Sequence, residues 1–167
     1  MALSEIKIRP FVGADLDGVL AVILPIQREE FGIAITADDQ PDLAVIPEFY
    51  QAGKGQFWVA VRNGQVVGTL GLKDIGNNQT ALRKMFVAAD VRGREHGVAT
   101  RLLSQLVTHA EDHGIKDIFL GTTDKFLAAH RFYEKNGFSE VSKEELPQSF
   151  PLMAVDSKFY RRGITAA

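Results

Sequence analysis

The chain has 167 residues, 46% of them hydrophobic, and its 19 lysine and arginine residues against 21 acidic ones give a formal net charge of −2. This length and composition predict one domain with a single core over residues 1–167. The near-zero charge argues against a nucleic-acid or anionic-membrane partner, so any anion site has to be local. The sequence has no cysteine, which excludes disulfides, thiolate metal sites and a cysteine nucleophile and is consistent with a cytoplasmic location.

The N-terminal part of the sequence is typical of a strand followed by helices. Residues 5–11 alternate apolar and charged side chains with the period of a half-buried strand, and a helix is expected to begin at Asp15. The charges in the first strand are not those of a signal peptide, and the apolar run 19–24 is too short to span a bilayer. Pro41 and Pro47 predict a short or broken helix in the next segment.

The middle of the chain carries the clearest strand signals. Two β-rich runs flank Asn63-Gly64, a pair that favours the positive φ angles of a tight turn, so strands two and three are expected to be antiparallel. Residues 80–87 follow as a fourth strand, and residues 97–113 have helical apolar spacing. The remaining segments complete a mixed α/β (α+β) order in which helices interrupt a partly antiparallel sheet: a strand over 115–121, a helix over 123–137, and strands over 138–141 and 151–160.

A basic turn that contains glycine, "RGREHGVATRLL" at residues 92–103, lies directly before the long helix. Gly93 and Gly97 allow backbone N–H groups to approach a ligand closely, and the N-terminus of the helix adds about half a positive charge. Arginine side chains can hold phosphate oxygens beside it. The turn fits neither the GxxxxGK[ST] phosphate loop nor the GxGxxG dinucleotide motif. The local pattern therefore leaves two readings open, a phosphate site and a solvated loop.

Two segments together, "RGREHGVA" from Arg92 and "AAHRFYEKNGF" from Ala128, resemble the GNAT family of N-acetyltransferases. Arg94, Gly97 and Ala99 fit the family's Arg/Gln-x-x-Gly-x-Gly/Ala turn, and the second segment is similar to its aromatic "FYEKxGF" helix end. The resemblance implies a largely antiparallel central sheet of about seven strands, with helices on both faces and a splay between strands 4 and 5.

The same resemblance implies an acetyl-CoA site within one N-acetyltransferase domain. The binding core is expected over about residues 81–141, with the pyrophosphate in the turn and the pantetheine arm along the fourth strand. Phe126 stands where many relatives have an asparagine that contacts this arm. Dimerisation through the terminal strands is compatible with the family. The residues expected to bind the coenzyme are Met85, Phe86, Val87, Arg92, Gly93, Arg94, Glu95, His96, Gly97, Val98, Ala99, Thr100, Phe126 and Phe132.

The implied reaction is acetyl transfer to a primary amine of a small molecule or peptide by direct attack on the thioester. The backbone N–H of Met85 is expected to stabilise the oxyanion, and Tyr133 to protonate the leaving thiolate. The sequence departs from the family at the base, because several relatives have a glutamate where this chain has Ala81. The alternatives are Glu30, Asp42, a water chain, or an amine that arrives neutral.

The acceptor and the metal content can also be addressed from the sequence. Residues 25–43 are rich in acidic side chains and would attract a cationic amine, and a solvated acidic loop is the alternative. His109 and His113 have the spacing of a metal pair but lack the HExxH pattern and a third ligand, so no metal is expected. Because Ala81 removes the expected base, a catalytically weak or inactive acyl-CoA-binding module is the alternative function. A domain that binds another phosphate group is the more distant one.

Overall fold

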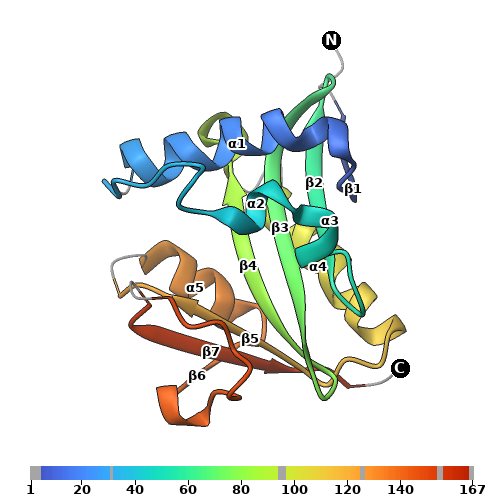
Figure 1. Ribbon diagram of the computed structural model, residues 1–167, viewed down its shortest axis with the longest axis vertical. Coiled ribbons are helices and arrows are strands. Elements are labelled where there is room, and N and C mark those ends of the chain that lie inside the picture. Colours follow the sequence, from blue (N-terminus) through green and yellow to red (C-terminus); the bar gives the residue numbers. More distant parts are fainter. Residues whose placement is uncertain (1–4, 31, 94–96, 125–126, 154–155, 166–167) are drawn as a thin grey trace.

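The sheet consists of an antiparallel half and a second half that joins it through a parallel pair. The computed structural model describes residues 5–30, 32–93, 97–124, 127–153 and 156–165. Across these residues seven strands lie in the order β1-β2-β3-β4-β5-β7-β6, with β4 and β5 parallel and the other neighbours antiparallel (Figure 1). This confirms the expected sheet. The strands are β1 (Ile6–Pro10), β2 (Gln56–Arg62), β3 (Gln65–Gly76), β4 (Gln79–Val87), β5 (Asp117–Thr122), β6 (Ser139–Val141) and β7 (Lys158–Gly163).

Helices cover both faces of this sheet. Leu102 of α4 and Tyr133 of α5 pack in one apolar cluster with Leu70 of β3. On the opposite face, Ile23 of α1 packs in a second cluster with Val59 of β2. Each face of the sheet is therefore buried under its own helices, as Figure 1 shows. The helices are α1 (Leu16–Pro25), α2 (Pro41–Ala44), α3 (Ile46–Phe49), α4 (Val98–Asp112) and α5 (Leu127–Lys135), and a π-helical turn, η2 (Ile26–Glu30), extends α1.

The predicted turns and breaks are confirmed where they depend on local backbone chemistry. Asn63 and Gly64 adopt positive φ angles of 54° and 76°, and they join β2 and β3 as a two-residue hairpin. The segment with two prolines forms α2 and α3, two helices of four residues each, and each has a proline in its first turn.

A bulge in β4 changes which side chains share a face. The register with β3 shifts between Thr69 and Gly71, so that Lys84 and Met85 together oppose one residue of β3. Lys84 has a φ of 56°, which is uncommon for a residue with a Cβ atom. The hydroxyl of Thr69, which is fully buried, donates a hydrogen bond to the Lys84 carbonyl at 2.7 Å. The bulge is thus held by a specific side chain.

β4 and β5 pair over only part of their length. Residues Gln79 to Ala81 pair with Asp117 to Phe119, whereas β4 continues to Val87. Figure 1 shows the two strands diverging beyond this contact. Over residues 82–87, the edge of β4 that faces this opening is not paired with β5, and unpaired backbone donors and acceptors require another partner.

We expect the valine variant of Thr69 to lose both stability and activity. Removing the hydroxyl leaves the Lys84 carbonyl without its buried donor, which should lower the free energy of unfolding by about 1–3 kcal/mol. The bulge should then relax, so kcat/KM should fall as well.

Thr80→Val is the matched control, since the buried Thr80 hydroxyl donates to the Asp117 carbonyl at 3.0 Å in the paired part of β4. Chemical denaturation and steady-state kinetics should show a comparable loss of stability in both variants but a loss of activity in Thr69→Val alone. Equal activity losses would contradict a special role for the bulge.

The final strand differs from its prediction. Residues 151–160 are expected as a strand, but β7 begins at Lys158 and pairs with β5 and β6. Pro151 and Met153 lie outside any strand and line a cavity instead. Proline has no N–H to donate to a sheet ladder, which favours this arrangement. Within the described parts of the chain, none of the helices combines the length and the apolar character needed to cross a membrane.

Candidate active site

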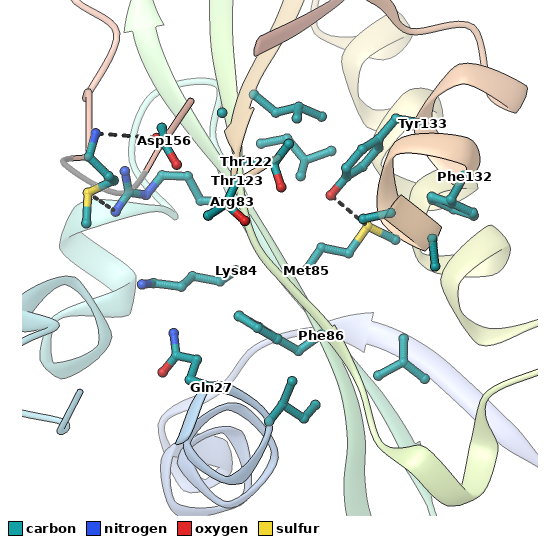
Figure 2. Close-up of a pocket in the computed structure, with 18 of the residues that line it drawn as sticks. Gln27, Arg83, Lys84, Met85, Phe86, Thr122, Thr123, Phe132, Tyr133 and Asp156 are labelled. Atoms are coloured by element: carbon teal, nitrogen blue, oxygen red, sulfur yellow. Dashed lines mark hydrogen bonds between the residues drawn. The ribbon is translucent and has the colours of Figure 1, made fainter. Parts of the chain in front are cut away.

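A cavity of about 850 Å³ opens where β4 and β5 separate. Its walls come from β4, from the end of β5, from α5, from the turn η2 with the residues after it, and from the segment before β7. Figure 2 shows Tyr133 and Phe132 on one side of β4 and Arg83, Lys84 and Gln27 on the other. The cavity therefore reaches both sides of the diverging strand, and it has room for a coenzyme arm and an acceptor.

The structure brings seven of the fifteen residues expected from the sequence to this cavity. Those that line it are Met85, Phe86, Val87, Arg92, Ala99, Phe132 and Tyr133. Four more, Gly93, Gly97, Val98 and Thr100, belong to the turn and the start of α4 next to Ala99. Arg94, Glu95, His96 and Phe126 lie outside the described residues.

Tyr133 is buried at the wall of the cavity. Its side chain packs against Phe138, with ring centroids 5.5 Å apart, and its hydroxyl makes a long contact of 4.0 Å to the Met85 sulfur. Burial raises the pKa of the Tyr133 hydroxyl above its ordinary value. The hydroxyl therefore remains protonated at neutral pH, and among the described groups it has only this weak sulfur partner. It is suited to donating a proton rather than to accepting one.

The turn before α4 has the backbone of an anion site. Gly93 and Gly97 have φ angles of 115° and 59°, and Gly97 is the N-cap of the 15-residue helix α4. The first N–H groups of a helix have no partner within the helix and lie at its positive end. The amides of Val98, Ala99 and Thr100 are in this position. They fit the requirement for binding a phosphate group.

Arg92 is already paired. Its Nε donates to the Val87 carbonyl at 2.8 Å, and its two terminal nitrogens donate to the Glu30 carboxylate at 2.6 and 2.9 Å. This bidentate ion pair ties the end of β4 to η2. Glu30, one of the candidate bases, is therefore held by an arginine that occupies both of its carboxylate oxygens.

The other candidate positions for a base are also occupied or apolar. Asp42 is buried, and one oxygen accepts a hydrogen bond from the Tyr50 hydroxyl at 2.5 Å. Ala81 is fully buried in an apolar cluster with Phe119, Phe150 and other aromatic side chains. The position where several relatives have a glutamate thus lies in a hydrophobic environment in this chain.

Three charged residues of the cavity wall were not predicted from the sequence as site residues. Lys84 donates to the Gln40 side chain at 2.7 Å, and burial lowers the pKa of its amine more than the nearby Asp42 raises it. Arg83 lies beside Lys84 on the strand, and Asp156 lies on the segment before β7. Burial raises the pKa of the Asp156 carboxyl. Adjacent residues of a regular strand point to opposite faces of the sheet. The sequence therefore did not indicate that Arg83 and Lys84 share a site, because the bulge that brings them together was not predicted.

His109 and His113 make contacts with backbone carbonyls and with each other. His109 Nε2 lies 2.8 Å from the Lys54 carbonyl, and the two imidazole rings stack with centroids 4.0 Å apart. Within the described residues there is no group of three or more histidine, aspartate or glutamate side chains that could hold a metal ion.

The family assignment follows from the comparison with family models. The model described as "Acetyltransferase (GNAT) family" matches residues 20–138, which is more than half of the chain. The chain belongs to the GNAT family. The resemblance inferred from the turn and the aromatic helix end is thus confirmed, and the expected enzyme class, an acyltransferase, is the class of this family.

Individual GNAT proteins support the same assignment. A crystal structure of an acetyltransferase of the GNAT family from Staphylococcus aureus Mu50 is 40% identical, with a TM-score of 0.91, and the alignment covers 96% of this chain and 100% of that chain. The N-acetylaspartate synthetase of Danio rerio is 37% identical over 106 residues, which are 62% of this chain and 37% of that protein. This chain therefore spans less than half the length of that relative.

The GNAT fold also occurs in a protein solved with coenzyme A. The N-acetylglutamate synthase of Neisseria gonorrhoeae, complexed with coenzyme A and N-acetylglutamate, has a TM-score of 0.72 at 18% identity, over 98% of this chain and 36% of that chain. At this identity the similarity concerns the fold alone. Coenzyme A use by proteins of this fold is consistent with the expected cosubstrate.

Proposed function

We propose that this chain is an acetyl-CoA-dependent N-acetyltransferase that transfers the acetyl group to a primary amine of a small molecule or peptide. The observation that supports this most directly is the cavity at the separation of β4 and β5, where the unpaired edge of β4, the N-terminus of α4 and Tyr133 come together. Each of these has a separate task in thioester aminolysis.

The coenzyme would be held mainly by backbone groups. The edge of β4 at Met85 and Val87 would pair with the amides of the pantetheine arm, which replaces the missing strand. The amides at the start of α4 would bind the pyrophosphate, and Phe132 would pack along the arm. All fourteen coenzyme-binding residues expected from the sequence keep this role in the proposal, including those outside the described residues.

The reaction requires one bond to form, one to break and two protons to move. The thioester supplies an activated acetyl carbon. The amine nitrogen bonds to this carbon, the carbon–sulfur bond breaks, the nitrogen loses a proton and the sulfur gains one. The N–H of Met85 would donate to the carbonyl oxygen while it carries negative charge, an interaction of about 2.7–4 kcal/mol in a measured case. Tyr133 would supply the proton to sulfur.

The proton on the amine has no acceptor at Ala81. Glu30 is bound by Arg92 and Asp42 by Tyr50, so neither is a free base in this structure. Asp156 is a further carboxylate at the cavity wall. A water chain or an amine that arrives neutral remains compatible with the site. The cationic acceptor suggested by residues 25–43 is a narrower form of this proposal, because an ammonium group would be attracted to carboxylates at the cavity.

The proposal is tested by adding acetyl-CoA and a panel of primary amines to the purified protein. Free coenzyme A and the acetylated amine should appear in equal amounts, measured by a thiol reagent and by mass spectrometry. Tight binding of acetyl-CoA with no turnover on any amine would instead support the inactive acyl-CoA-binding module, which the apolar surroundings of Ala81 favour as the second candidate. A protein that does not bind acetyl-CoA at all would contradict both.

A further inference from the structure

Two cations share one wall of the cavity, on the side of β4 away from Tyr133. The bulge directs both Arg83 and Lys84 to the side of β4 away from Tyr133 (Figure 2). There they lie 3.9 and 3.8 Å from the same oxygen of Asp42, which is on α2. Their side chains are only 14% and 10% exposed. Charged groups with so little exposure need partners, because transfer from water is costly for an ion.

Within the described residues, few of the N–H donors of the Arg83 guanidinium are used by a partner. The Nε of Arg83 donates to the Tyr50 hydroxyl at 3.2 Å. One of its terminal nitrogens lies 3.9 Å from the Met153 sulfur and 3.9 Å from an Asp42 oxygen. These distances exceed the usual 2.7–3.2 Å of an N–H···O bond. A guanidinium has five N–H donors in a planar fork that matches a carboxylate, so the fork is available to an anion in the cavity.

Lys84 adds donors beside this fork. Its amine donates one hydrogen bond of 2.7 Å, to Gln40, and lies 3.8 Å from Asp42. An ammonium group has three donors. The position of Gln40 is itself fixed, because its amide exchanges two hydrogen bonds of 2.9 and 3.0 Å with the amide of Gln27. The lysine is thus positioned by a buried amide pair.

The charges around these two cations are balanced. Asp42 and Asp156 are the carboxylates that interact electrostatically with Lys84, and Asp156 also interacts with Arg83. Among the described residues, the Asp156 carboxylate accepts one hydrogen bond, a long one of 3.4 Å from the Met153 N–H. The two cations have hydrogen-bond donors left for a ligand, and the Asp156 carboxylate can accept further hydrogen bonds. Such a site matches a ligand that carries charges of both signs.

We propose that the acceptor is an amino acid, or another short amine with a carboxylate close to its amino group, and that Arg83 with Lys84 binds that carboxylate. The inference rests on the proposed function, since it names the substrate class of the same site. Arg83 and Met85 are two residues apart on β4, which corresponds to at most about 7 Å along the strand, because the bulge shortens the rise between them. A carboxylate held at Arg83 therefore leaves the amine of a short molecule near the part of β4 assigned to the acetyl group. The ammonium form would be attracted by Asp156.

The wild-type protein tests this without any substitution. The assay compares an amino acid, its carboxamide and the corresponding amine without the carboxylate, over several side chains. The carboxylate form should have a kcat/KM about 10- to 100-fold above that of the carboxamide, the range expected for hydrogen bonds to a charged group. Equal acetylation of all three forms would overturn the inference and leave the proposed function intact. Absence of acetylation of any amine would be a failure of the proposed function.

Substitution of Arg83 identifies the residue responsible. In Arg83→Gln the preference for carboxylate over carboxamide should fall strongly, chiefly through a higher KM for the carboxylate form, and Lys84 should account for the preference that remains. Arg83→Lys keeps the charge without the fork and should retain part of the preference. Arg28→Gln is the matched control, an exposed arginine on η2 that does not line the cavity. A ratio measured on one protein sample does not depend on the folded fraction, so it remains informative if a variant is less stable. An Arg83→Gln protein with the wild-type ratio would overturn the role of Arg83.

Discussion

Replacement of Tyr133 by phenylalanine should lower kcat by about 10²–10⁴-fold, the usual contribution of general acid catalysis. The thiolate would then leave without its proposed proton donor, because the substitution removes the hydroxyl that lies beside the Met85 sulfur at the cavity wall. Among the described residues the Tyr133 hydroxyl has a sulfur at 4.0 Å as its partner, so its loss should cost little stability. Acetyl-CoA affinity should stay close to the wild-type value. Single-turnover kinetics and calorimetric binding measure the two effects separately.

Tyr160→Phe is the matched control for this experiment. Tyr160 is a buried tyrosine whose ring centroid lies 6.0 Å from that of Tyr133, but its hydroxyl donates to Glu134 at 2.7 Å and it does not line the cavity. It should lose stability without a comparable loss of kcat. If Tyr133→Phe kept the wild-type kcat while chemistry is rate-limiting, Tyr133 would not be the proton donor.

Introducing the carboxylate that several relatives carry, by Ala81→Glu, should destabilise the protein strongly. Ala81 is fully buried among aromatic side chains, and an uncompensated buried charge costs about 3–5 kcal/mol. We therefore expect a large decrease in the free energy of unfolding and no gain in activity. A single substitution is therefore not expected to restore a base, because the surroundings of Ala81 are apolar.

The pH dependence of this destabilisation is a further part of the test. Burial disfavours the ionised form of a carboxyl, so the folded variant would hold its proton to higher pH than the unfolded chain. Stability of the variant relative to wild type should then be greatest below about pH 4.3, the ordinary pKa of a glutamate, and fall as the pH rises from there towards the raised pKa of the folded state. Ala52→Glu, at an exposed position, is the control and should show little effect. An Ala81→Glu protein that is both stable and more active would show that the site accepts a base there.

The local features of the fold were predictable from the sequence. The hairpin at Asn63-Gly64 and the helix break between Pro41 and Pro47 depend on the φ preferences of a few residues, and both are confirmed. The long helix after Gly97 follows from an apolar period that no strand could satisfy. The last strand was misplaced because residues 151–157 are apolar enough to resemble a strand, whereas pairing with β5 begins at Lys158.

Two sequence motifs predicted the residues of the site, whereas their arrangement in space depends on contacts between residues that are distant in sequence. Met85, on β4, and Tyr133, on α5, were expected together, and both line the cavity. The pairing of Arg92 with Glu30 joins residues 62 positions apart, and no local pattern indicates it. Asp156 comes to the cavity only because the segment before β7 passes along its wall.

The sequence by itself determined the family, the order of helices and strands, and the backbone chemistry of the turn at Gly93 and Gly97, because short-range preferences and motif spacing carry these properties. The tertiary structure decided which side chains line the cavity on the side of β4 away from Tyr133. One inserted residue in β4 breaks the alternation of side chains, and it places Arg83 and Lys84 on one face. The sequence predicted that a base is missing at Ala81, and in the fold this residue lies among aromatic side chains, where a carboxylate would be costly to bury.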